Sequence, residues 1–240
     1  MPLINNIKIF GERNSGTTFL QNLLQSNVIN VNICSGAHNG GTGWKHGYPR
    51  LDFFENENTL FIFLIRDLET WLISMFKNPY HYKAPKTIEN FINNPMIIYE
   101  SDKTHDIHTN PEENKLIIDL RISKIKCYLE FFKVVDHALI INLESIQKDQ
   151  GKHLLTILHE TFEIYLQPNF NSIDTHTKCN QPLVNRNYSI QLPDLEKKIN
   201  KPVENFVQNL KDFDFYKVST INQIHSSFDE LLNDFSFHEP

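Results

Sequence analysis

The stretch from Gly11 to Thr18 constrains the fold of this chain more than any other. It reads Gly-Glu-Arg-Asn-Ser-Gly-Thr-Thr and separates an apolar, β-branched segment, residues 4–10, from residues 17–25, where apolar side chains recur with helical spacing. A strand, a glycine-containing loop and a helix in this order predict an anion-binding site, because the loop amides and the positive end of the helix dipole point the same way. The two glycines have the spacing of a phosphate loop, but Thr17 occupies the position where ATPases carry a lysine.

Without that lysine, the loop would hold a phosphate through backbone amides and hydroxyl groups, and Arg13 would supply positive charge from another direction. The alternative interpretation is an ordinary turn between strand and helix in which Ser15 or Thr17 caps the helix.

Further strands and helices alternate along the chain. We expect strands over 28–33, 59–65 and 138–142, and helices over 68–76, 114–132, 146–162, 195–210 (interrupted at Pro202) and 220–233, with a short helix and polar loop within 83–109. Alternating strands and helices predict an α/β fold, a central parallel sheet flanked by helices. No linker rich in Gly, Ser or Pro divides the 240 residues, so we expect a single domain.

Composition narrows the functional classes. The net charge of −6 disfavours a broad nucleic-acid-binding face, so we expect no nucleic-acid partner. Three cysteines without a CxxC pair suit a reducing compartment, and we expect a cytoplasmic protein without a secretion signal. The longest apolar run, Leu60 to Ile65, is too short to span a bilayer, so no membrane partner is expected.

A second polar motif follows the apolar strand 59–65. Arg66 stands at the expected carboxyl end of this strand, where open α/β sheets bind ligands, and Ser74 lies eight residues further along the next helix. An arginine with a hydroxyl can bind a second phosphate. The alternative is that Arg66 pairs with Asp67 or Glu69 at the start of the helix and Ser74 is a surface hydroxyl.

The two motifs together resemble the sulfotransferases that use 3′-phosphoadenosine 5′-phosphosulfate (PAPS). Ser15-Gly16-Thr17-Thr18 resembles the family's motif for the 5′-phosphosulfate, and Arg66 with Ser74 resembles its motif for the 3′-phosphate. Phe19 occupies the place of the family's adenine-stacking tryptophan, and the stretch 143–146 resembles its Tyr-Glu-Asp-Leu segment. The resemblance covers residues 4–165 and implies a P-loop NTPase-like sulfotransferase architecture, with a nucleotide-binding core over about 4–165 and a C-terminal helical part over about 166–240.

Some positions depart from the family pattern. Asn14 replaces a lysine that many members carry and that acts on the bridging oxygen. Arg13 would take over this role. Leu143 replaces a tyrosine. Arg186, in Asn-Arg-Asn-Tyr, is the nearest candidate for the family's late Arg-Lys-Gly loop.

The resemblance also indicates a base. Lys45 and His46 lie after the strand 28–33, where the family has a Lys-Thr-His-Leu-Pro stretch with a catalytic histidine. We therefore expect His46 to act as the base, with Lys45 and Arg13 as cations beside the transferring group. The other candidates for the base are Glu12, Asp67, His38 and His81, of which His81 could instead line the acceptor pocket.

We expect a metal-independent sulfotransferase with PAPS as donor and adenosine 3′,5′-bisphosphate (PAP) as product. The acceptor would be a hydroxyl or amine of a small molecule or glycan, bound by loops within 35–58 and 78–112. His105 and His108 have no further metal ligand at suitable spacing. A nucleoside or nucleotide kinase and a non-catalytic nucleotide-binding module remain alternatives; a fold-level analogy leaves the acceptor and the oligomeric state open.

Overall fold

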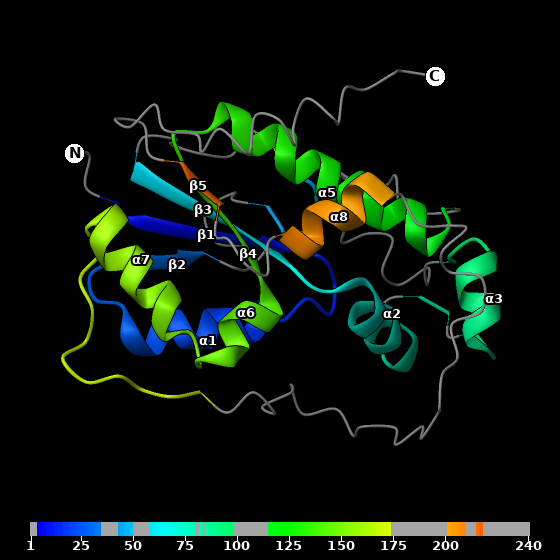
Figure 1. Ribbon diagram of the computed structural model, residues 1–240, viewed down its shortest axis with the longest axis horizontal. Coiled ribbons are helices and arrows are strands. Elements are labelled where there is room, and N and C mark those ends of the chain that lie inside the picture. The colour runs from blue at the N-terminus through cyan, green and yellow to red at the C-terminus, as the bar shows by residue number, and fades with distance from the viewer. Residues whose placement is uncertain are drawn as a thin grey trace.

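A computed structural model describes residues 4–34, 43–49, 58–79, 82–83, 85–97, 115–173, 201–209 and 215–217. Within these residues, five strands form one sheet in the order β2-β1-β3-β4-β5 (Figure 1). The strands are β1 (Asn6–Gly11), β2 (Asn32–Cys34), β3 (Thr59–Ile65), β4 (His137–Asn142) and β5 (Phe215–Lys217). The first four pair in parallel, which confirms the expected α/β class with a central parallel sheet.

Helices cover both faces of the sheet. On one face lie α1 (Thr17–Asn27), α6 (Leu143–Lys148) and α7 (Lys152–Phe162); on the other lie α5 (Ile117–Val134) and α8 (Lys201–Asn209). This double cover explains why every residue of β3 is buried and why its sequence is continuously apolar rather than alternating.

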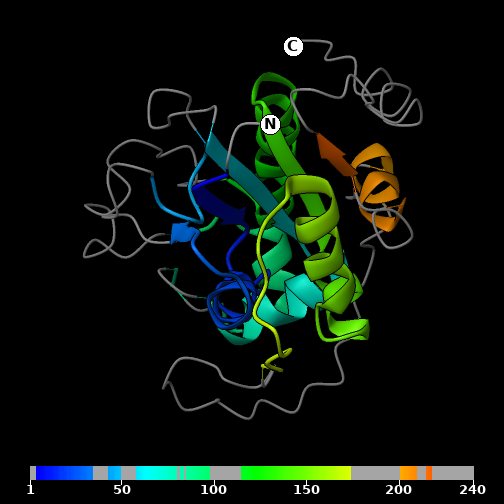
Figure 2. The same cartoon turned by 90° about the vertical axis from the view of Figure 1, so that its left-hand side faces the viewer.

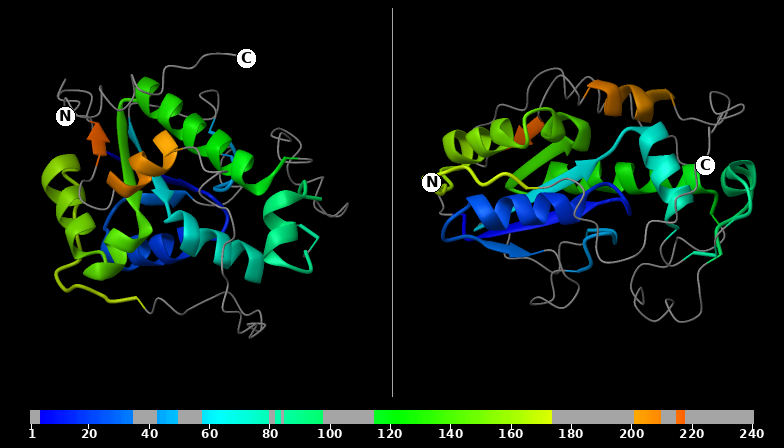
Figure 3. Two further views of the ribbon diagram at one scale, coloured as in Figure 1. Left: turned by 45° about the vertical axis from the view of Figure 1, so that its right-hand side comes forward. Right: turned by 90° about the horizontal axis from the view of Figure 1, so that it is seen from below.

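Two helices, α2 (Leu68–Lys77) and α3 (Ile88–Asn93), form a third apolar cluster with the first turn of α5. Figure 3 shows them together at the end of the molecule where β3 leads out of the sheet. The helix α2 follows β3 after only Arg66 and Asp67, so the motif that contains Arg66 lies between the sheet and this cluster.

The carboxyl ends of the parallel strands meet at one edge of the sheet. Gly11 pairs in register with Leu64, and Ile65 pairs with Asn142. The chain leaves β1 toward β2 on one side and leaves β3 toward β4 on the other, so the strand order reverses between β1 and β3. Ligands of open α/β sheets bind at such a switch point. The loops after β1 and β3, which carry the two sequence motifs, therefore lie side by side.

Several predicted elements need correction. The helix predicted over 146–162 is two helices, α6 and α7, because Gln150 and Gly151 adopt positive φ angles of 61° and 86° and interrupt it. The strand predicted over 28–33 starts later and ends one residue further on, as β2, because α1 extends to Asn27 and Asn30 adopts a positive φ angle of 61°.

The C-terminal region adds a strand that the sequence did not suggest. β5 pairs antiparallel with β4 at the sheet edge and lies beside α8 (Figure 2), so the sheet is not wholly parallel. Of the helix predicted over 195–210, residues 201–209 form α8, which includes Pro202 in its first turn instead of being interrupted there. Residues 195–200 and the helix predicted over 220–233 lie outside the described residues. None of the described helices combines the length and apolar character needed to cross a membrane.

Candidate anion-binding site

The loop from Gly11 to Thr18 folds into a tight turn ahead of α1. Both the backbone N–H and the hydroxyl of Ser15 donate to the Glu12 carbonyl, at 3.1 and 2.7 Å. Asn14 and Gly16 adopt positive φ angles of 61° and 90°, and Gly16 is the N-cap residue of α1, which consequently has no side-chain cap. The Ser15 hydroxyl is thus used inside the loop rather than as a helix cap, and the first-turn amides of α1 are left to another acceptor.

Both glycines of the motif are required by close neighbours. A Cβ atom on Gly11 would lie 2.6 Å from Ser15 Oγ and 2.8 Å from the Leu64 carbonyl oxygen. A Cβ atom on Gly16 would lie 2.6 Å from Leu143 Cδ1. The segment after β4, which the sequence resemblance singled out, therefore packs directly on the loop.

Arg66 extends from the end of β3 to the same loop. Its Nη1 donates to the Asn14 carbonyl at 2.9 Å, and its Nε donates to Thr70 Oγ1 at 3.2 Å. Glu144 Oε1 of α6 lies 3.6 Å from this Nε, and the Asp67 carboxylate also interacts electrostatically with Arg66. About a quarter of the Arg66 side chain (25%) stays exposed. Burial of the remainder lowers the Arg66 pKa, and Glu144 opposes this effect.

Ser74 lies on the face of α2 toward which Arg66 points. It follows Thr70 by four residues, and side chains at this spacing share one face of a helix. Ser74 is partly exposed, and no hydrogen bond of its hydroxyl is found among the described residues. The predicted pair of an arginine and a hydroxyl is therefore compatible with the geometry of α2.

Asn14, which replaces the family's lysine, attaches the loop to the end of α2. Its Nδ2 donates to the Asn78 carbonyl at 2.9 Å and lies 3.1 Å from Met75 Sδ. The side chain thus holds the backbone in position, and the Asn14 carbonyl becomes the contact for Arg66.

The Arg13 guanidinium lies between two aromatic rings. Its Cζ is 4.5 Å from the Trp44 ring centroid and 4.8 Å from that of Tyr82, and the residue is only 5% exposed. The Arg13 carbonyl accepts a hydrogen bond of 2.8 Å from Trp71 Nε1. Arg66 therefore contacts the backbone carbonyl of Asn14, the residue next to Arg13. The guanidinium groups of Arg13 and Arg66 have different neighbours.

Lys45 and His46 pack against the beginning of the same loop. The Gly11 N–H donates to the Lys45 carbonyl at 2.9 Å, and Lys45 Nζ donates to Thr18 Oγ1 at 3.1 Å. His46 Nδ1 lies 2.8 Å from the Gly11 carbonyl oxygen. Because a carbonyl only accepts, Nδ1 carries the hydrogen and Nε2 keeps the lone pair.

The surroundings of His46 keep its ring neutral. Burial lowers the pKa of His46 well below its ordinary value of 6.5, and the positive charges of Lys45, Lys124 and Arg13 lower it further, against the bond to Gly11. A neutral imidazole with a free Nε2 lone pair is the form that a general base needs.

Two buried cations under the site were not identified from the sequence. Arg121 is fully buried; its Nη1 contacts Glu12 Oε2 at 2.6 Å and its Nη2 donates to the Arg66 carbonyl at 2.8 Å. Its Nε contacts Glu204 Oε1 of α8 at 3.1 Å. Lys124, one turn later on α5, donates to the His46 carbonyl. The sequence contains one indication of their burial: in the predicted helix, Arg121 and Lys124 occupy positions on the same side as the inward-facing apolar residues.

The other candidates for the base are held by internal contacts or lie outside the described residues. Glu12 is bound to Arg121, and Asp67 Oδ1 accepts from Asn142 Nδ2 at 3.0 Å.

Phe19, which was predicted to stack on adenine, packs against the apolar cluster beneath α1 and is partly buried. His38, His81 and Arg186 lie outside the described residues, as do His105 and His108.

Comparisons with protein-family models, with curated proteins and with solved structures gave no match. The described part of the chain holds no group of three His, Cys, Asp or Glu side chains able to bind a metal ion. The site must therefore be interpreted from its own geometry and from the sequence motifs.

Replacement of Glu12 by glutamine tests the electrostatics beneath the loop. Burial raises the Glu12 pKa from 4.5 to about 7, although Arg121 opposes the shift. Between pH 4.5 and about 7, the folded protein therefore binds one more proton at Glu12 than the unfolded chain does. As pH rises through this range, the contribution of Glu12 to the free energy of unfolding falls. Relative to wild type, Glu12→Gln should gain stability between about pH 5 and about pH 7, measured by urea denaturation.

Comparing the two proteins at each pH cancels the opposite contribution of His46, whose lowered pKa costs stability as pH falls below 6.5. A stability difference that stays constant across the range would show that Glu12 is ionised throughout.

Proposed function

We propose that this protein is a PAPS-dependent sulfotransferase that transfers a sulfuryl group to a hydroxyl or amine of a small molecule or glycan. The observation that carries the proposal is the hydrogen bond from Arg66 Nη1 to the Asn14 carbonyl. It joins the two sequence motifs, which lie 52 residues apart, at the switch point of the sheet. A donor with phosphate groups at both ends of an adenosine suits two neighbouring anion sites.

The residues around the loop fit the 5′-phosphosulfate end of such a donor. The uncapped first-turn amides of α1, the Thr17 and Thr18 hydroxyls and the Lys45 ammonium all belong to one loop and its contacts. These groups would bind anionic oxygens through hydrogen bonds and charge, as at other helix N-termini. Arg66 with Ser74 would bind the 3′-phosphate.

Transfer then requires one bond to form and one to break. The acceptor oxygen or nitrogen attacks the sulfur of PAPS, and the bond from sulfur to the bridging phosphate oxygen breaks to release PAP. His46 Nε2 would take the acceptor proton, because Nδ1 is fixed by the Gly11 carbonyl. Lys45, supported by the more distant charge of Arg13, would stabilise the negative charge that develops on the leaving oxygen.

A non-catalytic nucleotide-binding module is the second candidate. It is favoured by the side chain of Asn14, which contacts α2, and by the position of the Arg13 guanidinium between Trp44 and Tyr82. The Asn14 side chain carries no charge, and the charge of Arg13 would act on a bridging oxygen only from a distance. A kinase is less well supported, since Thr17 occupies the position of the catalytic lysine.

Two substitutions test the 3′-phosphate site by calorimetry with PAP. Arg66→Ala should weaken binding by about 2–4 kcal/mol, because it removes a charged phosphate partner. Ser74→Ala should weaken it by about 1.5–3 kcal/mol, the usual worth of a hydrogen bond to a charged group. Ser74 is the cleaner probe, because Arg66 also supports the loop through Asn14.

Lys148→Ala, an exposed charge removal on α6, and Ser123→Ala, a hydroxyl removal on α5, serve as the controls and should leave PAP affinity unchanged. Wild-type affinity in both test variants would exclude Arg66 and Ser74 from the binding site.

His46→Ala tests the base. Turnover with PAPS and an accepted substrate should fall by about 100-fold with PAP affinity retained, the typical contribution of a general base. Since the pKa of His46 lies well below 6.5, wild-type turnover should stay high as pH falls through 6.5 rather than halve there. Near-wild-type turnover of His46→Ala would assign the base to another group, and no transfer by the wild type to any acceptor would favour the non-catalytic module.

A further inference from the structure

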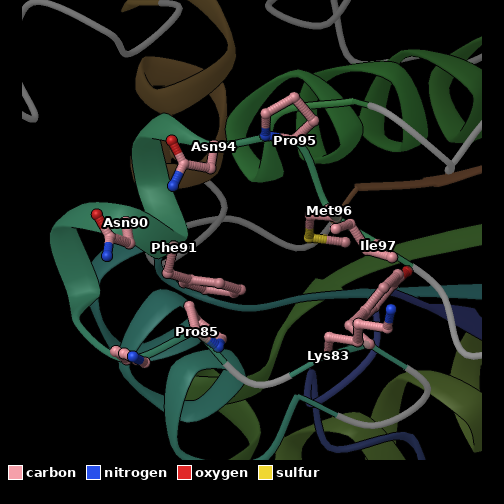
Figure 4. Close-up of a pocket in the computed structure, with 10 residues that line it drawn as sticks. Lys83, Pro85, Asn90, Phe91, Asn94, Pro95, Met96 and Ile97 are labelled. Carbon is pink, nitrogen blue, oxygen red and sulfur yellow. The ribbon is translucent and has the colours of Figure 1, made fainter.

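A pocket lies beside the candidate site, around α3 and the segments before and after it. Its volume is about 260 Å³, and Figure 4 shows the Phe91 ring pointing from α3 into the space between Pro85 and Met96. Tyr82, Phe91 and Met96 are nearly fully buried, exposing 2%, 4% and 4%. They give the pocket an apolar floor that suits the flat face of a ring.

The rim of the pocket is polar and positively charged. Lys83 and Lys86 contribute two ammonium groups, and Asn90 and Asn94 contribute amides that can both donate and accept hydrogen bonds. None of the described residues lining the pocket is acidic. Amides suit hydroxyl groups, and two lysines suit a negatively charged substituent.

Tyr82 connects this pocket to the phosphate loop. Its ring lines the pocket and also lies 4.8 Å from the Arg13 guanidinium carbon. The Tyr82 N–H donates to the Pro79 carbonyl at 3.0 Å, and the adjacent Asn78 carbonyl accepts from Asn14. Tyr82 therefore belongs both to the lining of the pocket and to the surroundings of Arg13.

The size of the pocket limits what it can hold. Small-molecule sites commonly occupy about 300–1,000 Å³, so a volume of about 260 Å³ suits one ring rather than an extended chain.

We propose that this pocket, formed by Tyr82, Phe91 and Met96 beneath Lys83, Lys86, Asn90 and Asn94, binds a hydroxyl-bearing ring that also carries a carboxylate. The role of this ring as the sulfuryl acceptor rests on the proposed function; its binding does not. A sugar acid and a phenolic acid share this chemistry, and the experiment below distinguishes them.

The test is ligand-observed NMR titration of the full chain with D-glucuronate, 4-hydroxybenzoate and, as the uncharged comparison, D-glucose. At least one of the two carboxylates should bind the wild type, and the one that binds identifies the ring type. The double variant Lys83→Ala/Lys86→Ala should bind it about tenfold or more weakly, since a hydrogen bond to a charged group is lost. Glucose affinity should not differ between the two proteins.

The control variant Lys148→Ala/Lys152→Ala removes the same number of charges from exposed positions on α6 and α7 and should bind the carboxylate like the wild type. The proposal is overturned if neither carboxylate binds, or if the two double variants lose the same affinity.

Calorimetry with PAP on the same samples separates the two proposals. PAP affinity of Lys83→Ala/Lys86→Ala should equal that of the wild type, because neither lysine belongs to the phosphate loop. Carboxylate binding without PAP binding in the wild type would support the pocket and refute the proposed function.

Discussion

The buried guanidinium of Arg121 is the contact on which the arrangement of the candidate site depends. One side chain from α5 binds Glu12 after β1, the Arg66 carbonyl after β3 and Glu204 of α8, and it lies 5.0 Å from the Trp71 ring. Such a charge is tolerated in an interior only when it is paired and hydrogen-bonded. Because burial raises the Glu12 pKa to about 7, the cluster can approach neutrality with Glu204 as the main counterion.

The contacts of Arg121 with Glu12 and the Arg66 carbonyl hold the loops after β1 and β3 in position, and further hydrogen bonds fix the backbone of the first loop. Trp71, stacked near Arg121, donates to the Arg13 carbonyl, and Arg66 donates to the Asn14 carbonyl. The Arg13 carbonyl is therefore held by a side chain of α2, and the Asn14 carbonyl by a side chain at the end of β3. The first-turn amides of α1 remain uncapped, and His46 presents Nε2 because Gly11 fixes Nδ1. A preorganised set of donors of this kind is what transfer of a charged group requires.

The sequence predicted the local features well and the long-range ones poorly. The bounds of β3 matched because a continuous apolar run ends at Arg66, and the loop was recognised from the spacing of Gly11 and Gly16. The break between α6 and α7 depends on the positive φ angles of Gln150 and Gly151. It was not predicted, because the apolar residues of 146–162 keep helical spacing across the break. The burial of Arg13 and the partners of Arg121 could not be predicted, because Tyr82, Glu12 and Glu204 approach these side chains only in the folded chain.

We propose that the loops after β1 and β3 form one site for both phosphate groups of a single nucleotide. Calorimetry with PAP, adenosine 5′-monophosphate and Mg-ATP at one ionic strength tests it most directly. PAP should bind without magnesium and at least about 100-fold more tightly than the monophosphate, since the 3′-phosphate adds charge-assisted hydrogen bonds to both Arg66 and Ser74. Equal affinity for PAP and the monophosphate, or tighter binding of Mg-ATP than of PAP, would contradict the claim.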